Sequence, residues 1–270
     1  MPDPRVMPDD EAARRAQTPT QGPPAEARPA ATYAGGPRPG RAGSRGNPIT
    51  DPPRLPLVAP SILAANAARL GEECRGVLAA GGDMLHYDVM DGHLVPNLAL
   101  GVDMLGSLSA ELPGAFFDVH LMIEHPHRFA EAFARAGAGH LTFHVEALDG
   151  PAGRALMDRV RSLGLSVGVA VDGPTPIERV RELAPHADMV LVMAIRAGFS
   201  GQAFDPAALE RVSYVRSIVP DTVRVEVDGG VGPAQAGPLR QAGADVLASA
   251  TAIFGVSPED RASVIAQLRG

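Results

Sequence analysis

Short hydrophobic runs alternate with longer segments of helical periodicity from Leu55 to the end of the chain. The short runs are rich in valine and other apolar residues and are bounded by glycine or polar residues, a pattern that is typical of buried strands. The predicted strands are 58–63, 83–90, 115–122, 140–146, 166–171, 189–194, 223–228 and 246–249. The alternation indicates repeated βα units.

The predicted helices lie between these strands and include 67–80, 127–136, 152–163, 176–184, 206–219 and 233–242. Ser257 and Pro258 have the residue types of an N-cap and a first helical position, so a last helix is expected to begin there. Eight βα units predict an α/β fold of the (β/α)8 TIM-barrel type. The alternative is an open doubly wound sheet. We disfavour it because no GxGxxG motif follows the first strand and because polar strand ends are spread along the whole domain.

Residues 1–54 differ in composition from the rest of the chain, since they hold 12 of the 26 prolines and 8 of the 24 arginines. Such a segment cannot bury enough apolar surface to offset the entropy lost on ordering. It also lacks the features of a secretory signal or an organellar transit peptide. We therefore expect a disordered tail rich in Pro, Arg, Gly and Ala over 1–54, without effect on the chemistry, and a barrel domain over 55–270.

The composition narrows the classes of function. All 24 basic residues are arginine, which excludes a Schiff-base aldolase, a pyridoxal-phosphate anchor and a Walker-A loop, because each needs a lysine. The net charge of −7 argues against a nucleic-acid partner. No apolar run reaches the roughly 18 residues needed to cross a membrane. The single Cys74 precludes an internal disulfide and fits a reducing compartment, so we expect a cytoplasmic protein.

Three of the predicted strands carry polar residues near their C-terminal ends. Since side chains alternate along a strand, residues two apart share a face. The pairs placed on one face in this way are His86 with Asp88, Asp118 with His120, and Glu226 with Asp228. In a barrel these strand ends converge, and two His with two Asp form an N/O donor set for Zn²⁺, Fe²⁺, Mn²⁺ or Co²⁺. The alternative is that buried His and Asp side chains simply pair with one another.

Three successive loops in the second half of the domain consist of small residues. They are 198–201 after the sixth predicted strand, Gly229-Gly230 after the seventh, and Ala250-Thr251 after the eighth. Small residues let backbone N–H groups approach a ligand, and the loops after strands seven and eight are the usual phosphate site of this fold. Any one loop is explained equally well by a tight turn, but three neighbouring loops favour a phosphate site.

The domain from Leu55 to Gly270 resembles the ribulose-phosphate 3-epimerase family. The motifs that carry the resemblance, in chain order, are Ala59-Pro60-Ser61-Ile62-Leu63, residues 86–93 with Val95-Pro96-Asn97, residues 118–122, residues 190–193, Gly198-Phe199 with Gly201-Gln202, and residues 227–231. Their order along the chain is the order found in the family, and together they cover essentially the whole predicted barrel.

The resemblance implies that His86, Asp88, His120 and Asp228 bind one divalent metal ion, with Zn²⁺ first and Fe²⁺, Mn²⁺ or Co²⁺ as alternatives. It also implies that Asp88 and Asp228 are the catalytic acid/base groups on opposite faces of the sugar. The reaction would convert D-ribulose 5-phosphate to D-xylulose 5-phosphate in the pentose phosphate pathway. One Asp would remove the C3 proton, the metal would stabilise a 2,3-enediolate, and the other Asp would return a proton to the opposite face.

The resemblance further implies a set of substrate contacts. The matching substrate-binding positions are Ser61, His120, Gly198, Phe199, Ser200, Gly201, Gly229, Gly230, Ala250 and Thr251, and the methionines expected to line the site are Met90, Met122 and Met193. We expect a small phosphosugar as the binding partner and a homo-oligomer as the assembly. Of the other histidines, only His93 and His144 lie near enough to strand ends to support the site; the rest are expected to be structural or solvent-facing.

The chain departs from the family in its phosphate loops. Ser200 stands where the family usually has glycine, and Ala250-Thr251 replaces the usual Gly-Ser. If the family glycine has a positive φ, Ser200 would be strained by roughly 1 kcal/mol. Two alternatives to a ribulose-5-phosphate epimerase therefore stay open. One is an epimerase of another ketose phosphate, such as allulose 6-phosphate, and the other is a catalytically weak phosphosugar-binding paralogue.

Overall fold

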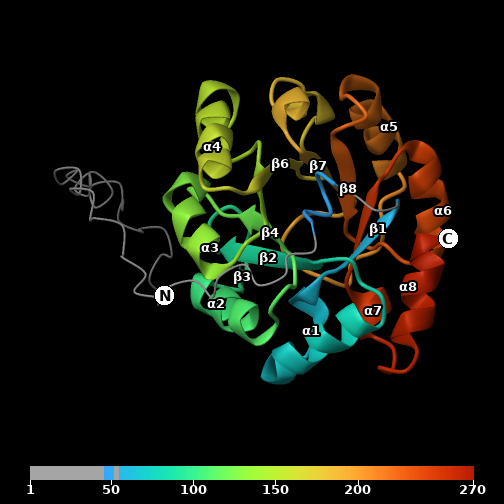
Figure 1. Ribbon diagram of the computed structural model, residues 1–270. Helices are drawn as coiled ribbons and strands as arrows, with labels where there is room; N and C mark the ends of the chain where they lie inside the picture. Colours follow the sequence, from blue (N-terminus) through green and yellow to red (C-terminus); the bar gives the residue numbers. More distant parts are fainter. Residues whose placement is uncertain (1–45, 52–54) are drawn as a thin grey trace, which may run out of the picture. The chain divides into compact units, whose positions relative to one another are not determined.

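A single curled sheet forms the centre of the molecule (Figure 1). The computed structural model describes residues 46–51 and 55–270, and within them the sheet has nine strands in the order β1-β9-β8-β7-β6-β5-β4-β2-β3. The strands are β1 (Leu57–Pro60), β2 (Leu85–Asp91), β3 (Leu98–Ala99), β4 (Phe117–Met122), β5 (His140–His144), β6 (Ser166–Val171), β7 (Met189–Met193), β8 (Arg224–Asp228) and β9 (Val246–Ser249).

The sheet closes into a barrel of eight parallel strands. A parallel bridge between Ser61 and His86 joins the end of β1 to β2, and the short β3 adds an antiparallel pair to the outer end of β2. The register places Asp88 opposite His120 on β4, and Met193 opposite Asp228 on β8. The predicted (β/α)8 barrel is therefore confirmed.

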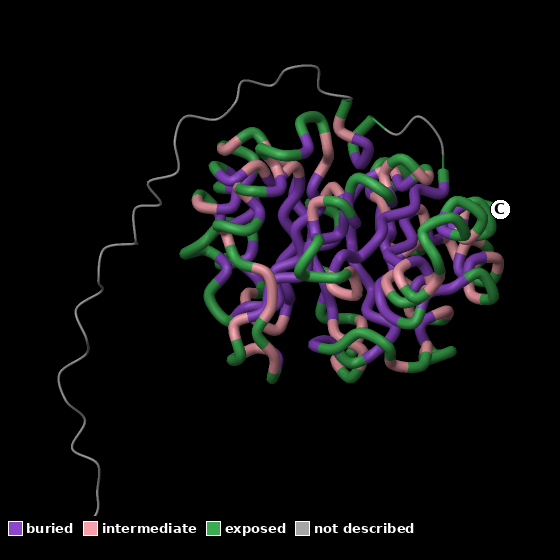
Figure 2. Tube along the Cα trace, turned by 90° about the horizontal axis from the view of Figure 1, so that it is seen from below, coloured by how far each residue is buried: buried purple, intermediate pink, exposed green. Residues whose placement is uncertain are grey.

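The helices surround the strands (Figure 1). They are α1 (Leu70–Ala79), α2 (Val102–Glu111), α3 (Ala130–Ala136), α4 (Gly150–Ser162), α5 (Ala208–Ile218), α6 (Pro233–Ala242), α7 (Thr251–Phe254) and α8 (Arg261–Arg269). Outward-facing strand residues such as Tyr87, Val119 and Val169 are fully buried in the core beneath these helices. Figure 2 shows the buried residues gathered in the centre and the exposed residues on the outer turns. Among the described helices, none is long and apolar enough to cross a membrane.

The helices match the sequence less closely than the strands do. The segment predicted as a helix over 176–184 forms only 3₁₀ turns at Ile177–Val180 and Ala184–His186. Pro185 explains part of this difference, because it has no N–H with which to continue a helix. The last helix begins at Arg261, because the Ser257 hydroxyl donates to Asp260 Oδ2 (2.9 Å) instead of capping a helix, and residues 258–260 form a turn.

Residues 46–51 pack against the end of the barrel at which the strands begin. The side chain of Ile49 is fully buried. Arg224 Nε at the start of β8 donates to the carbonyl of Ile49 (3.2 Å), and Asn47 Nδ2 donates to Ser166 Oγ at the start of β6 (3.0 Å). The apolar residues that cluster with Ile49 are Leu57, Ala59, Met84, Met189 and Val246.

These six residues differ from the expectation of a disordered tail over 1–54. The reason is local: Ile49 is an apolar residue within a proline-rich stretch, and the mouth of the barrel offers it an apolar cluster. Residues 1–45 and 52–54 lie outside the described part of the chain, so disorder there stays a prediction.

Candidate active site

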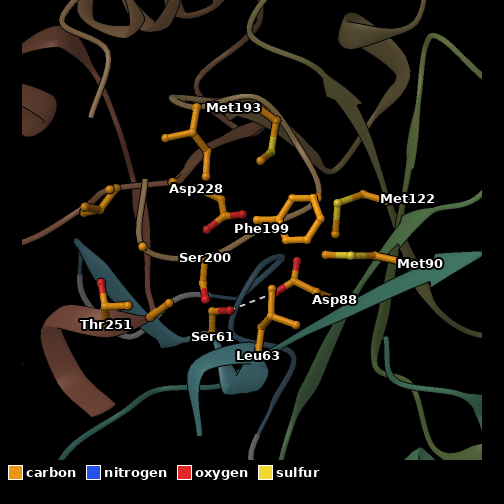
Figure 3. A pocket seen from close by; sticks show the side chains of 17 residues that line it. Ser61, Leu63, Asp88, Met90, Met122, Met193, Phe199, Ser200, Asp228 and Thr251 are labelled. Atoms are coloured by element: carbon orange, nitrogen blue, oxygen red, sulfur yellow. Dashed lines mark hydrogen bonds between the residues drawn. The ribbon is translucent and has the colours of Figure 1, made fainter. Parts of the chain in front are cut away.

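A pocket lies at the C-terminal ends of the barrel strands (Figure 3). It holds about 450 Å³ of space, including solvent at its mouth. The predicted residues that line it are Ser61, Asp88, Met90, Met122, Met193, Gly198, Phe199, Ser200, Gly201, Asp228, Gly229, Gly230, Ala250 and Thr251. Leu63, Ile195 and Val231 also line it and were not predicted. Of the predicted site residues, only His86 and His120 do not line the pocket; both are fully buried and contact Asp88.

Four predicted metal ligands meet at the floor of this pocket. His86, Asp88, His120 and Asp228 each offer one nitrogen or oxygen, and these four atoms lie within 4.8 Å of one another. The convergence follows from the strands: His86 and Asp88 alternate on β2, His120 faces Asp88 across the β2–β4 pair, and Asp228 ends β8. His86 and His120 are fully buried, and the two aspartates are buried with their carboxylates toward the pocket.

The contacts around Asp88 orient its carboxylate. Ser61 Oγ donates to Asp88 Oδ2 at 2.7 Å (Figure 3), and His120 Nδ1 lies 3.0 Å from Asp88 Oδ1. His86 Nε2 lies 3.3 Å from Asp88 Oδ1 and 3.9 Å from Asp228 Oδ2. Asp88 therefore has a neighbour on each oxygen and cannot turn away from the pocket without losing one of them.

An unpaired buried nitrogen in this cluster indicates that the residues fit a divalent cation. His86 Nε2 is buried and has no hydrogen-bond partner among the described residues, although it faces the carboxylates of Asp88 and Asp228. An unsatisfied buried nitrogen is costly, and pairing of His and Asp alone does not satisfy it. A cation between one imidazole nitrogen and two carboxylates would satisfy it, and mixed N/O donors suit first-row divalent metals.

The pocket-facing carboxylates have opposite pKa shifts. Burial acts to raise the pKa of Asp88, but the charge of His86 and the close contact with His120 outweigh it and lower the pKa. For Asp228, burial and then the charge of Asp88 raise the pKa to about 7. With no ion bound, Asp88 thus favours its ionised form and Asp228 accepts a proton more readily, so the two carboxyls differ in acid strength.

A pair of carboxyl groups stands behind His86. His86 Nδ1 donates to Asp118 Oδ2 at 2.7 Å, and Glu226 Oε1 lies 3.3 Å from the same nitrogen. These three residues form a second group with the spacing of metal ligands. The hydrogen bond fixes the tautomer of His86: because a carboxylate only accepts, Nδ1 carries the proton and Nε2 faces the pocket. Asp118 Oδ1 and both oxygens of Glu226 are buried without a hydrogen-bond partner among the described residues. Burial and the Asp118 charge raise the pKa of Glu226 well above its ordinary value.

The phosphate-site loops have backbone that only glycine adopts easily. Gly198, Gly201, Gly229 and Gly230 all have positive φ, and a Cβ on Gly230 would lie 2.6 Å from the backbone nitrogen of Phe204. Ser200 is not in this region, since Leu100 is the one described non-glycine residue with positive φ. The strain considered for Ser200 therefore does not arise, and its side chain lines the pocket.

Comparison with known proteins agrees with this geometry. A family model for the ribulose-phosphate 3 epimerase family matches residues 57–254. The chain belongs to the ribulose-phosphate 3-epimerase family. A ribulose-phosphate 3-epimerase of Mycobacterium tuberculosis is 43% identical over 219 residues, covering 79% of this chain and 92% of that protein. One from Candida glabrata is 40% identical over 217 residues, covering 75% and 87%.

Solved structures with this fold extend beyond the epimerases. A 3-keto-L-gulonate-6-phosphate decarboxylase from Vibrio cholerae superposes with a TM-score of 0.63 at 13% identity, covering 80% of this chain and 96% of that one. At such identity the likeness shows the barrel fold alone. The resemblance to epimerases inferred from the sequence motifs is confirmed, and the protein is an enzyme of the isomerase class.

Of the two histidines that the sequence analysis considered as support for the site, one lies next to a predicted metal ligand and the other does not. His144 contacts His120, whereas His93, the other histidine considered for support, is an exposed residue that bonds to the carbonyl of Asp91. Glu146 lies next to His144; burial acts to raise its pKa, but the hydrogen bond and charge of His144 hold that pKa at about 2. Glu146 was not predicted; it comes two residues after His144 in the predicted strand 140–146, and this alternation was a signal that could have marked it.

Proposed function

We propose that the protein converts D-ribulose 5-phosphate to D-xylulose 5-phosphate by inverting C3, with one divalent metal ion held by His86, Asp88, His120 and Asp228. The observation that carries the proposal is the pair of pocket-facing carboxyls, Asp88 and Asp228, which both lie close to His86 Nε2 within a cluster of four nitrogen and oxygen donors. Zn²⁺ is the first choice of metal, with Fe²⁺, Mn²⁺ and Co²⁺ as alternatives that the same donors accept.

The two aspartates take the proton transfers. In one direction Asp88, held ionised, removes the C3 proton from one face, and Asp228 returns a proton to the other; the roles exchange in the reverse direction. When bound, the cation supplies electrostatic stabilisation to the enediolate oxygens. The Ser61 hydroxyl donates its proton to Asp88, so its oxygen can accept a hydrogen bond from a substrate hydroxyl. Met90, Met122 and Met193 keep the reacting carbon in an apolar surrounding.

The phosphate group would bind through backbone N–H groups of the three loops. The domain has no lysine, and the nearby glycines permit a close backbone approach. Ser200 and Thr251 add hydroxyl groups at the pocket wall. Phe199 is half exposed at the mouth, where its ring lies over the opening (Figure 3).

The decisive experiment uses ¹H NMR of each pure epimer in D₂O. With metal-loaded Asp88→Asn or Asp228→Asn, net epimerisation should fall by at least about 10²-fold, the usual scale for a lost general base. Exchange of the C3 proton should persist weakly for one epimer and vanish for the other, with opposite preferences in the two variants. Asp103→Asn, at an exposed position of α2, is the control and should behave as wild type. Near wild-type epimerisation by either metal-loaded variant would refute the two-base assignment.

The choice of substrate is tested separately. Turnover of ribulose 5-phosphate and of a hexulose phosphate, measured side by side, distinguishes the proposed activity from that of a sister epimerase for allulose 6-phosphate. No turnover of either would favour the phosphosugar-binding paralogue. A cytoplasmic location, a homo-oligomer and a chemically passive segment over residues 1–54 remain predictions.

A further inference from the structure

His144 on β5 lies directly behind the proposed metal ligand His120. The two Nε2 atoms are 2.8 Å apart, and the rings stack with centroids 5.0 Å apart at an interplanar angle of 17°. Both side chains are buried, with His144 1% exposed. His144 does not line the pocket, so its position points to a role that acts through His120.

Glu146 contacts the ring nitrogen of His144 that does not face His120. Its Oε2 lies 3.0 Å from His144 Nδ1, and its Oε1 accepts the backbone N–H of Asp172 at 3.0 Å. Both oxygens of this carboxylate are therefore occupied as acceptors. A chain of contacts runs from Asp88 through His120 and His144 to Glu146.

Counting protons along this chain fixes their positions. Three contacts at hydrogen-bond distance join Asp88 to His120, His120 to His144, and His144 to Glu146, and the two neutral imidazoles supply only one ring proton each. The carboxylate of Glu146 only accepts, so His144 carries its proton on Nδ1 and has a lone pair on Nε2. That lone pair needs the proton of His120 Nε2. The remaining contact, between His120 Nδ1 and Asp88 Oδ1, then has no proton, and two lone pairs face each other there. A cation bound by both atoms would relieve this repulsion.

We infer that Glu146 and His144 are positioning residues that hold His120 in the tautomer whose Nδ1 faces the metal. The inference rests on the proposed function, because it assumes a metal at this site. His86 needs the opposite tautomer, and Asp118 imposes it by accepting the proton of Nδ1 so that Nε2 faces the pocket. The two histidine ligands thus present different nitrogens, each selected by a separate carboxylate.

The geometry specifies an informative variant, Glu146→Gln. A glutamine there must direct its oxygen to the N–H of Asp172, so its amino group faces His144 Nδ1. His144 then accepts at Nδ1 and carries its proton on Nε2, where it opposes the proton of His120. His144→Leu removes the acceptor altogether and is the second variant. The matched control is His140→Leu: His140 is buried on the same face of β5, but its nitrogens contact Ser166 and Thr142.

The test measures Zn²⁺ affinity of the full chain by chelator competition, together with side-chain ¹⁵N shifts of the Zn²⁺-loaded protein. Glu146→Gln and His144→Leu should bind Zn²⁺ about 10–100-fold more weakly, the usual effect of losing such support, and His140→Leu should stay within about threefold. His144 should be protonated at Nδ1 in wild type and at Nε2 in Glu146→Gln.

The outcomes separate this inference from the proposed function. A wild-type protein that binds neither Zn²⁺ nor any of the alternative metals would overturn the metal site and the inference together. A wild type that binds Zn²⁺, with both variants binding as tightly, would overturn the inference alone. An equal loss in His140→Leu, or His144 protonated at Nε2 in wild type, would do the same.

Discussion

Replacing Ile49 by alanine tests whether residues 46–51 are part of the folded barrel. The side chain is fully buried among apolar residues at the mouth where the strands begin. Truncating a buried isoleucine to alanine costs about 2–5 kcal/mol, and the low end applies here because a short terminal segment can detach locally. For a chain of this size, about 2 kcal/mol corresponds to a fall in Tm of about 4–8 °C.

The assay is thermal and denaturant unfolding, with kcat/KM measured alongside. Thr50→Ala is the matched control, since Thr50 is the exposed neighbour, and its free energy of unfolding should change by less than about 0.5 kcal/mol. Because the pocket lies at the opposite end of the barrel, kcat/KM of Ile49→Ala should stay within about threefold of wild type. A free energy of unfolding unchanged in Ile49→Ala would mean that this segment does not pack in solution as it does in the structure.

Two further predictions concern the site. Metal affinity should fall as the pH is lowered from 8 to 6, because the pKa of Asp228 is raised to about 7 and the pKa of His86 is also raised, so both groups must lose a proton to bind the ion. Calorimetry in buffers of different ionisation enthalpy should detect this proton release. A metal affinity that does not change with pH would contradict the prediction. Gly230→Ala should raise KM for the phosphosugar at least about tenfold, since the φ of +64° strains alanine and its Cβ meets Phe204. Gly237→Ala, where nothing lies within 4 Å, is the control and should leave KM unchanged.

The parts of the site that sequence could predict are those fixed by local alternation. His86 and Asp88 share a face because they are two residues apart on one strand, and this needs no knowledge of the neighbouring strand. The convergence of β2, β4 and β8 then followed from the barrel, since polar strand ends meet at its C-terminal face. The placement of the three loops of small residues at the pocket followed in the same way.

The parts that sequence missed depend on contacts between distant elements. The contact between His120 and His144 requires the lateral placement of β5 beside β4, which the pattern along either strand does not contain. The burial of Ile49 depends on an apolar mouth built from the starts of several strands. Helix α2 escaped detection for a local reason, because Gly106, Ser107 and Ser109 weaken its helical pattern.

The distribution of polar residues links the stability of this barrel to its chemistry. TIM-barrel interiors are usually filled by layers of branched apolar side chains, whereas this one carries buried charges beneath its pocket. Several of their polar atoms have no hydrogen-bond partner among the described residues, and one of these, His86 Nε2, faces two carboxylates. A bound cation would remove the cost of that unpaired nitrogen in the folded state and not in the unfolded chain, so a metal that serves the proposed reaction would also stabilise the fold. At the other end of the barrel an apolar side chain, Ile49, packs into a cluster of apolar residues.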